Sequence, residues 1–134
     1  MNATSDESRK MNLLVVDDER LIADSLAWIL NLRGFNARSV YSGTEAIDHA
    51  VMNPIDILIS DVVMEGTSGI DAAIEICKLL PKCRVLLLSG NIGTSDMLKA
   101  AHDLGHDFDI LAKPVHPDEI IDRLKAMMGD NSHR

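Results

Sequence analysis

Residues 11–20, MNLLVVDDER, place a run of apolar residues directly before two adjacent aspartates. The run at 12–16 is typical of a buried strand, and Asp17 and Asp18 follow where that strand should end. Two neighbouring carboxylates repel each other, so this arrangement calls for a partner that offsets the repulsion. The stretch therefore predicts a buried first strand with a charged site at its carboxyl end.

Four further apolar runs follow the first, and a helix-like segment comes after each run. The runs are residues 35–40, 55–60, 84–88 and 108–112, and the helical segments are expected at 19–33, 42–51, 70–80, 95–104 and 120–128. The third and fourth runs are apolar on consecutive residues, which suits parallel strands covered on both faces. The second run is more polar, which places it near an edge. Strict alternation predicts an α/β fold: a five-stranded parallel sheet with five helices, doubly wound in three layers.

Length and charge limit the classes of function. The chain has 134 residues and a net charge of −8, which fits one globular domain at 11–129 with flexible tails at 1–10 and 130–134. So acidic a domain is not expected to bind nucleic acid or an anionic membrane directly. Two cysteines make no disulfide framework, and the polar N-terminus lacks a signal peptide. We therefore expect a cytoplasmic protein.

The ends of the other predicted strands carry the remaining polar candidates. Asp61 follows the third strand, Ser89 the fourth and Lys113 the fifth. Ligands of such folds bind at the carboxyl ends of the strands, so these side chains should converge with the first two aspartates.

The physics of that set points to phosphoryl chemistry. Three carboxylates about 5 Å apart would repel by roughly 3 kcal/mol per pair at an effective dielectric constant near 20. A Mg²⁺ ion, which prefers oxygen ligands, would remove that penalty. Together with Lys113 it would suit a transferring phosphoryl group, with Asp61 as the nucleophile and Ser89 as a hydrogen-bond donor.

Four motifs carry a resemblance to a known family. They are LLVVDDE at 13–19, DILISDVVMEGTSG at 56–69, VLLLSG at 85–90 and LAKP at 111–114. In this order and spacing they resemble the receiver domain of two-component response regulators, which has a flavodoxin-like fold similar to that of chemotaxis receivers. The resemblance covers about residues 11–129.

The resemblance implies a role for each motif residue. Asp61 would accept phosphate from a sensor histidine kinase or a histidine phosphotransfer protein. Mg²⁺ would be held by Asp17, Asp18, Asp61 and the backbone carbonyl of Val63. Ser89 and Lys113 would bind the phosphoryl group, and the peptide bond before Pro114 would be cis.

The same resemblance implies a phosphorylation-dependent switch of protein–protein interactions rather than an enzyme acting on outside substrates. A downstream protein partner would bind a surface spanning roughly residues 92–129, and a phosphorylation-dependent dimer is a further expectation. Too few residues follow the last predicted helix for an output domain. The chain thus acts by binding another protein or is a receiver excised from a longer regulator, and its polar end favours a stand-alone protein.

Three positions depart from the family pattern. Glu65 stands where proline usually follows the methionine, which adds negative charge near the site. Val63 cannot assist an attacking water, so slow loss of phosphate is expected, to be compared with a Val63→Asn variant. Ile110 occupies the position of the aromatic switch residue, and Phe108, two residues earlier on the same strand face, is a candidate substitute.

Some of these residues also fit other interpretations. Asp18 alone could cap the following helix. The first strand resembles a Walker B strand, but no phosphate-binding loop sequence accompanies it. A haloacid-dehalogenase phosphatase would need an aspartate at position 63. The sequence HDLGH at 102–106 superficially resembles a zinc motif, although Gly105 should end that helix.

Two rival functions remain beside the switch. An unphosphorylated pseudo-receiver used for docking would have lost the acid pair, Asp61 or Lys113, and none is lost. A phosphatase for outside substrates would need a general acid or base beside Asp61, and the sequence offers no candidate.

Overall fold

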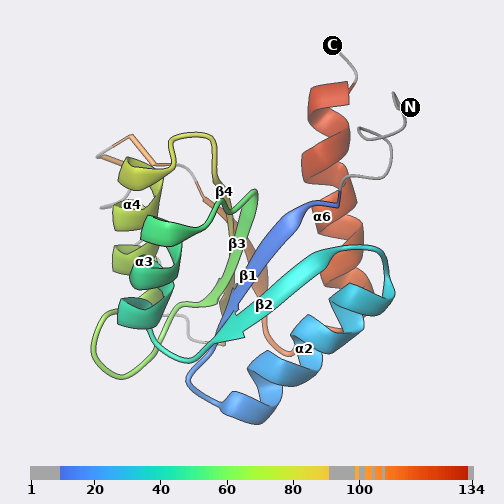
Figure 1. The fold of residues 1–134 in the computed structure, drawn as a ribbon, viewed down its shortest axis with the longest axis horizontal. Coiled ribbons are helices and arrows are strands. Elements are labelled where there is room, and N and C mark those ends of the chain that lie inside the picture. Colours follow the sequence, from blue (N-terminus) through green and yellow to red (C-terminus); the bar gives the residue numbers. More distant parts are fainter. Residues whose placement is uncertain (1–9, 91–98, 100–101, 104, 107, 133–134) are drawn as a thin grey trace.

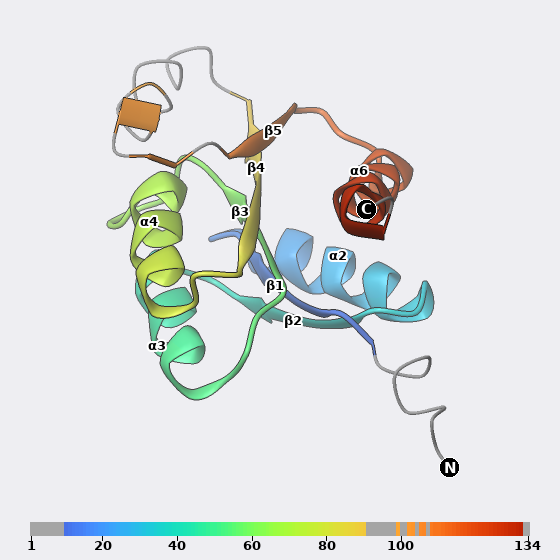
Figure 2. The same ribbon diagram turned by 90° about the horizontal axis from the view of Figure 1, so that it is seen from above.

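The computed structural model describes residues 10–90, 99, 102–103, 105–106 and 108–132. A central sheet separates two layers of helices, with α2 and α6 on one face and α3 and α4 on the other (Figures 1 and 2). The described elements are β1 (Asn12–Val16), α2 (Arg20–Leu32), β2 (Asn36–Val40), α3 (Gly43–Met52), β3 (Ile57–Asp61), α4 (Gly69–Leu79), β4 (Arg84–Ser89), β5 (Asp109–Ala112) and α6 (Pro117–Ser132).

All neighbouring strands of the sheet run parallel, in the order β2-β1-β3-β4-β5. The order reverses direction at β1, because the chain first adds β2 on one side and then β3, β4 and β5 on the other. This is the doubly wound arrangement, in which the carboxyl ends of β1 and β3 flank the switch point. The more polar β2 lies at an edge, as its sequence predicts.

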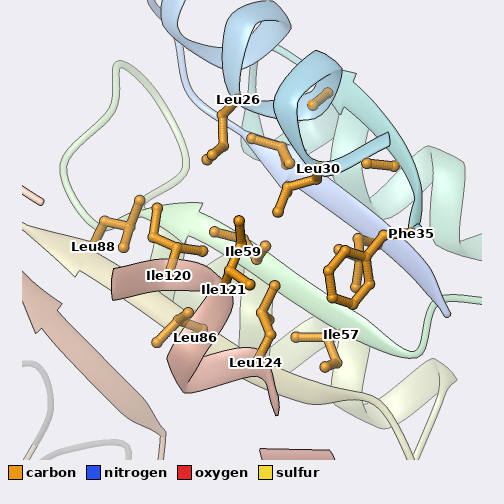
Figure 3. Packing of buried hydrophobic residues seen from close by; sticks show 14 of the residues in the cluster. Leu26, Leu30, Phe35, Ile57, Ile59, Leu86, Leu88, Ile120, Ile121 and Leu124 are labelled. Atoms are coloured by element: carbon orange, nitrogen blue, oxygen red, sulfur yellow. The ribbon is translucent and has the colours of Figure 1, made fainter. Parts of the chain in front are cut away.

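Each face of the sheet carries its own hydrophobic cluster. Alternate residues of one strand point to opposite faces, so Ile57 and Ile59 of β3 pack toward α2 and α6, whereas Leu58 packs toward α3 and α4. Figure 3 shows the first cluster, where Leu30 of α2 and Leu124 of α6 meet the sheet. Both sides being covered explains why the central strands are apolar on consecutive residues.

Serine side chains cap the first turns of α3 and α4. The Ser42 hydroxyl accepts a hydrogen bond from the Glu45 N–H at the start of α3. Ser68 does the same for the Asp71 N–H at the start of α4. These N-caps satisfy backbone donors that the first helical turn leaves unpaired.

The predicted element bounds agree with the structure to within a few residues. β1 matches the expected run at 12–16, and α2 ends before Gly34, whose φ of 97° suits glycine. The helix expected at 95–104 falls mostly outside the described residues, although residues 99, 102 and 103 are helical. α6 continues to Ser132, so residues 130–132, expected as tail, are helical.

Within the described ranges, every helix is too short or too polar to span a membrane.

Candidate functional site

The strand register brings the polar candidates to one edge of the sheet. Val16 of β1 pairs with Ser60 of β3, so the residues that follow, Asp17 and Asp61, stand side by side. Ser89 of β4 pairs with Ala112 of β5. Lys113 therefore leaves β5 next to the end of β4, and its backbone N–H donates to the Ser89 carbonyl at 2.8 Å.

The three aspartates form one carboxylate group. Asp17, Asp18 and Asp61 each offer an oxygen, and these atoms lie within 4.8 Å of one another. Their exposures differ, because Asp17 is buried, Asp61 is half-buried and Asp18 is exposed. Such a set of hard oxygen ligands, open to solvent on one side, could hold a divalent cation.

Asp17 is the buried member of the group, and its pKa is raised. Burial raises the pKa of this carboxyl above its ordinary value, and the nearby negative charges of Asp61 and Asp18 raise it further. A hydrogen bond from the Glu19 N–H, 2.9 Å from Asp17 Oδ1, and the positive charge of Lys113 act in the opposite direction. The ionised form of Asp17 therefore gains from any additional positive charge at the site.

Lys113 supplies one such charge. Its Nζ lies 3.0 Å from Asp61 Oδ1, and the two side chains are 31% and 13% exposed, respectively. A Cβ added at Gly90 would lie 3.6 Å from the Lys113 stem, which is an ordinary van der Waals contact, so the lysine passes close to the residue that follows β4. The Lys113–Pro114 peptide bond is cis, as the resemblance implies.

The turn after β3 fixes the backbone of Asp61. The Val62 N–H donates to the Leu88 carbonyl at 3.1 Å, and the Val62 carbonyl accepts from the Gly69 N–H at 2.8 Å. A Cβ at Gly69 would lie 2.0 Å from the Asp61 carbonyl oxygen, so only glycine fits there. Sequence reasoning did not identify Gly69, although it is the last residue of the 56–69 motif.

The loop between β3 and α4 presents two of the departures from the family pattern. Val63 is 55% exposed, so its side chain faces solvent beside the acid group. The backbone N–H of Glu65 donates to Asp18 Oδ2 at 3.3 Å. This contact was not predicted, because it depends on the backbone path of the loop rather than on a side chain.

Asp18 does not cap the helix, which was the alternative to a role in the site. The N-cap of α2 is Glu19, whose side chain makes no capping hydrogen bond. The Glu19 N–H is held by Asp17 instead. Asp18 is thus left facing the other two aspartates.

The switch candidates lie on one face of the sheet. Ile110 of β5 and Phe108 just before it are both partly buried and pack against the cluster under α3 and α4. Their shared face agrees with the two-residue spacing. Ser89 at the end of β4 is buried, at 8% exposure.

Among the described residues, the three aspartates are the one group of three or more side chains that could ligate a metal ion. The two histidines of HDLGH do not belong to such a group. His106 instead lies against Phe108, with ring centroids 5.6 Å apart.

Comparison with known proteins agrees with this geometry. The family model of the response regulator receiver domain matches residues 13–125. Response regulator MprA of Mycobacterium avium (strain 104) is 30% identical over 118 residues, which make up 88% of this chain and 51% of that protein. The chain spans about half the length of the curated relatives it matches.

Solved structures extend the likeness to three dimensions. A response regulator receiver domain protein from Clostridium thermocellum is 32% identical with a TM-score of 0.69, covering 87% of this chain and 98% of that one. A response regulator protein from Burkholderia pseudomallei, solved with a phosphorylated aspartic acid, a calcium ion and citrate, is 27% identical with a TM-score of 0.74, covering 89% and 73%. The chain therefore belongs to the family of response regulator receiver domains, the signalling domains of two-component systems.

Proposed function

We propose that this receiver domain accepts a phosphoryl group on Asp61 and changes its protein contacts in response. The observation that carries the proposal is the position of Lys113 Nζ, 3.0 Å from an Asp61 oxygen that also belongs to the three-carboxylate group. An ammonium on one side of a nucleophilic carboxylate and a cation site on the other would stabilise the charge of a transferring phosphoryl group.

The residues of the site fit a divalent cation. Asp17, Asp18 and Asp61 would hold Mg²⁺, with the backbone carbonyl of Val63 as a further oxygen ligand. The bound ion would supply positive charge that offsets the carboxylate repulsion and the charge of the incoming phosphate. The calcium ion of the Burkholderia protein, which carries a phosphorylated aspartate, is a cation of the same oxygen-seeking class.

The transfer itself would occur at the Asp61 carboxylate. One carboxylate oxygen forms a bond to phosphorus while the bond from phosphorus to the donor histidine nitrogen breaks, and that nitrogen keeps the electron pair. Lys113 would then offset the negative charge of the phosphoryl oxygens, and the Ser89 hydroxyl would donate a hydrogen bond to one of them. The domain would act on its own Asp61 and not turn over outside substrates.

A hollow beside the site suits a protein phosphodonor. It has a volume of about 790 Å³ and includes Asp17 and Lys113 together with apolar residues of α2 such as Leu21 and Ile22. Trp28 and Leu32 extend the exposed apolar surface of α2, at 66% and 67% exposure. A sensor histidine kinase or histidine phosphotransfer protein would bind this side and present its phosphohistidine to Asp61.

The output would use a second surface, which meets the hollow near Lys113. We place the downstream protein partner, or a second copy of the chain in a phosphorylation-dependent dimer, on the surface of roughly residues 92–129. Ser89, Ile110 of β5 and Phe108 just before it would link this surface to the phosphorylation state. Much of residues 92–107 lies outside the described part of the chain.

Phosphorylation by acetyl phosphate, resolved on a phosphate-affinity gel, tests the proposal directly. We expect a shifted band for the wild type that requires Mg²⁺ and disappears in Asp61→Ala. Asp48→Ala removes an exposed aspartate of α3 and is the matched control, which should shift like the wild type. A wild type that binds Mg²⁺ yet never shifts would contradict the proposal and favour an unphosphorylated docking module. Steady release of phosphate from a small ester would instead indicate a phosphatase.

A further inference from the structure

The backbone of Glu65 contacts the carboxylate group of Asp17, Asp18 and Asp61 directly. Its N–H donates to Asp18 Oδ2 at 3.3 Å, across 47 residues of sequence. Asp18 is the exposed member of the carboxylate group, and it lies in the segment between β1 and α2. This hydrogen bond therefore ties the loop after β3 to a carboxylate that follows β1.

Such a hydrogen bond favours cation binding by the carboxylate that accepts it. A carboxylate has two oxygens, and a donor that holds one of them orients the other toward the cation. An exposed aspartate otherwise samples several rotamers and must give up that freedom when it binds. An N–H supplied by the backbone performs this role without introducing a competing positive charge.

The identity of residue 65 decides whether the donor exists. Proline has no backbone N–H, whereas every other residue has one. Gly66 follows with a φ of 81°, a conformation that glycine adopts without strain. The hydrogen bond to Asp18 thus requires a residue other than proline at position 65.

We propose that Glu65 is a positioning residue whose backbone N–H orients the Asp18 carboxylate for Mg²⁺. The inference rests on the proposed function, because it assumes that Asp18 is a ligand of the cation. In this proposal the loop after β3 contributes to Mg²⁺ binding through its backbone, and the Glu65 side chain has the smaller effect.

Calorimetric titration with MgCl₂ separates the backbone from the side chain. Glu65→Ala and Glu65→Gln keep the N–H and remove the charge, whereas Glu65→Pro removes both. We expect the proline variant to bind Mg²⁺ about threefold to tenfold more weakly than the alanine variant, a ratio that added salt does not change. The smaller difference between wild type and alanine should shrink with salt, because it is a charge effect between exposed groups.

An NMR measurement keeps the test independent of how the proline variant folds. In the metal-free protein, Asp18→Ala should shift the Glu65 amide proton upfield, because it loses its acceptor. Asp17→Ala is the matched control. It should shift the amide proton of Glu19, which donates to Asp17 Oδ1, and leave the amide proton of Glu65 unshifted.

The outcomes are distinct. Equal Mg²⁺ affinity in the proline and alanine variants, or a Glu65 amide that ignores Asp18→Ala, would overturn the inference. A wild-type protein that binds no Mg²⁺ at all would contradict the proposed function as well. Wild-type binding with a salt-independent loss in the proline variant alone would support both.

Discussion

At the scale of single residues, Gly69 holds the end of β3 in place. A Cβ at this position would lie 2.0 Å from the Asp61 carbonyl oxygen and 2.8 Å from Ser60 Oγ. The nearest atom is backbone, so it cannot rotate away as a side chain could. The start of α4 and the phosphoacceptor candidate therefore share a contact that tolerates no side chain.

Gly69→Ala should consequently destabilise the protein and displace Asp61. We expect a loss of about 1–3 kcal/mol in the free energy of unfolding, as for other overpacked sites, together with weaker labelling by acetyl phosphate. Gly129→Ala is the control, because a Cβ there meets nothing within 4 Å and alanine favours a helix. Urea unfolding of both variants decides the point. Equal stability of Gly69→Ala and wild type would show that the two elements separate without cost.

Asp17 offers a second prediction at this scale. Its pKa is raised above the ordinary value of 3.8 by burial and by its acidic neighbours. The folded state thus holds the proton more tightly than the unfolded chain does. The contribution of Asp17 to stability is best below pH 3.8, and it is lost as the pH rises from there through the raised folded value.

Asp17→Asn removes this penalty at neutral pH. We expect the variant in EDTA to be more stable than the wild type by roughly 0.5–2 kcal/mol, while its Asn oxygen still accepts the Glu19 N–H. Added MgCl₂ should stabilise the wild type and not the variant. The measurement is thermal unfolding at pH 7, with and without Mg²⁺. A metal-free variant less stable than the wild type would show that the carboxylate is well compensated without a cation.

At the scale of elements, α2 has two apolar sides with different tasks. Leu30 is fully buried against the sheet, while Leu21 is 79% exposed on the same helix. Leu21, Ser25, Trp28 and Leu32 are spaced four, three and four residues apart, so they share a face of the helix. The fold does not need this face, which leaves it available for a partner.

Leu→Ala substitutions at these two positions test the division. Leu30→Ala should cost about 2–5 kcal/mol in the free energy of unfolding, because it opens a cavity in the core. Leu21→Ala should change it by less than about 0.5 kcal/mol. Unfolding in urea followed by circular dichroism measures both. A large cost at Leu21 would mean that its side chain is already covered within the folded chain.

The same scale shows what the sequence can predict about the fold. The sequence indicates the strands because apolar runs end sharply at charged residues, as at Val16 and Asp17. It does not indicate where each helix ends, because an apolar stripe marks the buried face and not the full length. α6 begins at Pro117, three residues before its stripe starts at Ile120, since proline and acidic residues suit a first turn.

The site divides in the same way. Asp17, Asp61 and Lys113 were predictable, because parallel strands bring their carboxyl ends to one edge. The Glu65 N–H and the tight packing at Gly69 were not. Both depend on how a loop backbone runs, and an apolar pattern contains no information about that path.

At the scale of the whole molecule, the site joins parts of the chain that are far apart in sequence. Asp17 follows β1, Asp61 ends β3 and Lys113 connects β5 to α6. The chain carries a net charge of −8, and its three clustered carboxylates add local repulsion to that excess. Lys113 and a bound Mg²⁺ would therefore compensate the same negative charges.

If Lys113 and Mg²⁺ compensate the same charges, the loss of unfolding free energy on removing the lysine should depend on whether Mg²⁺ is bound. Lys113→Met keeps the apolar stem and removes the charge, so in EDTA it should lower the free energy of unfolding by about 1–3 kcal/mol. In saturating MgCl₂ at equal ionic strength the cost should fall by at least half, because the cation already balances Asp61 and would repel the lysine.

Lys78→Met is the control for this comparison. Lys78 pairs with Glu75 at 3.3 Å, but both side chains are more than half exposed, so the cost should stay below about 0.5 kcal/mol with or without Mg²⁺. Urea unfolding of the three proteins under both conditions completes the cycle. If Lys113→Met costs the same in EDTA and in MgCl₂, the lysine and the cation do not act on a common set of charges. If Mg²⁺ reduces the cost of Lys113→Met but not that of Lys78→Met, then Lys113 and the cation both compensate the carboxylates at the ends of β1 and β3.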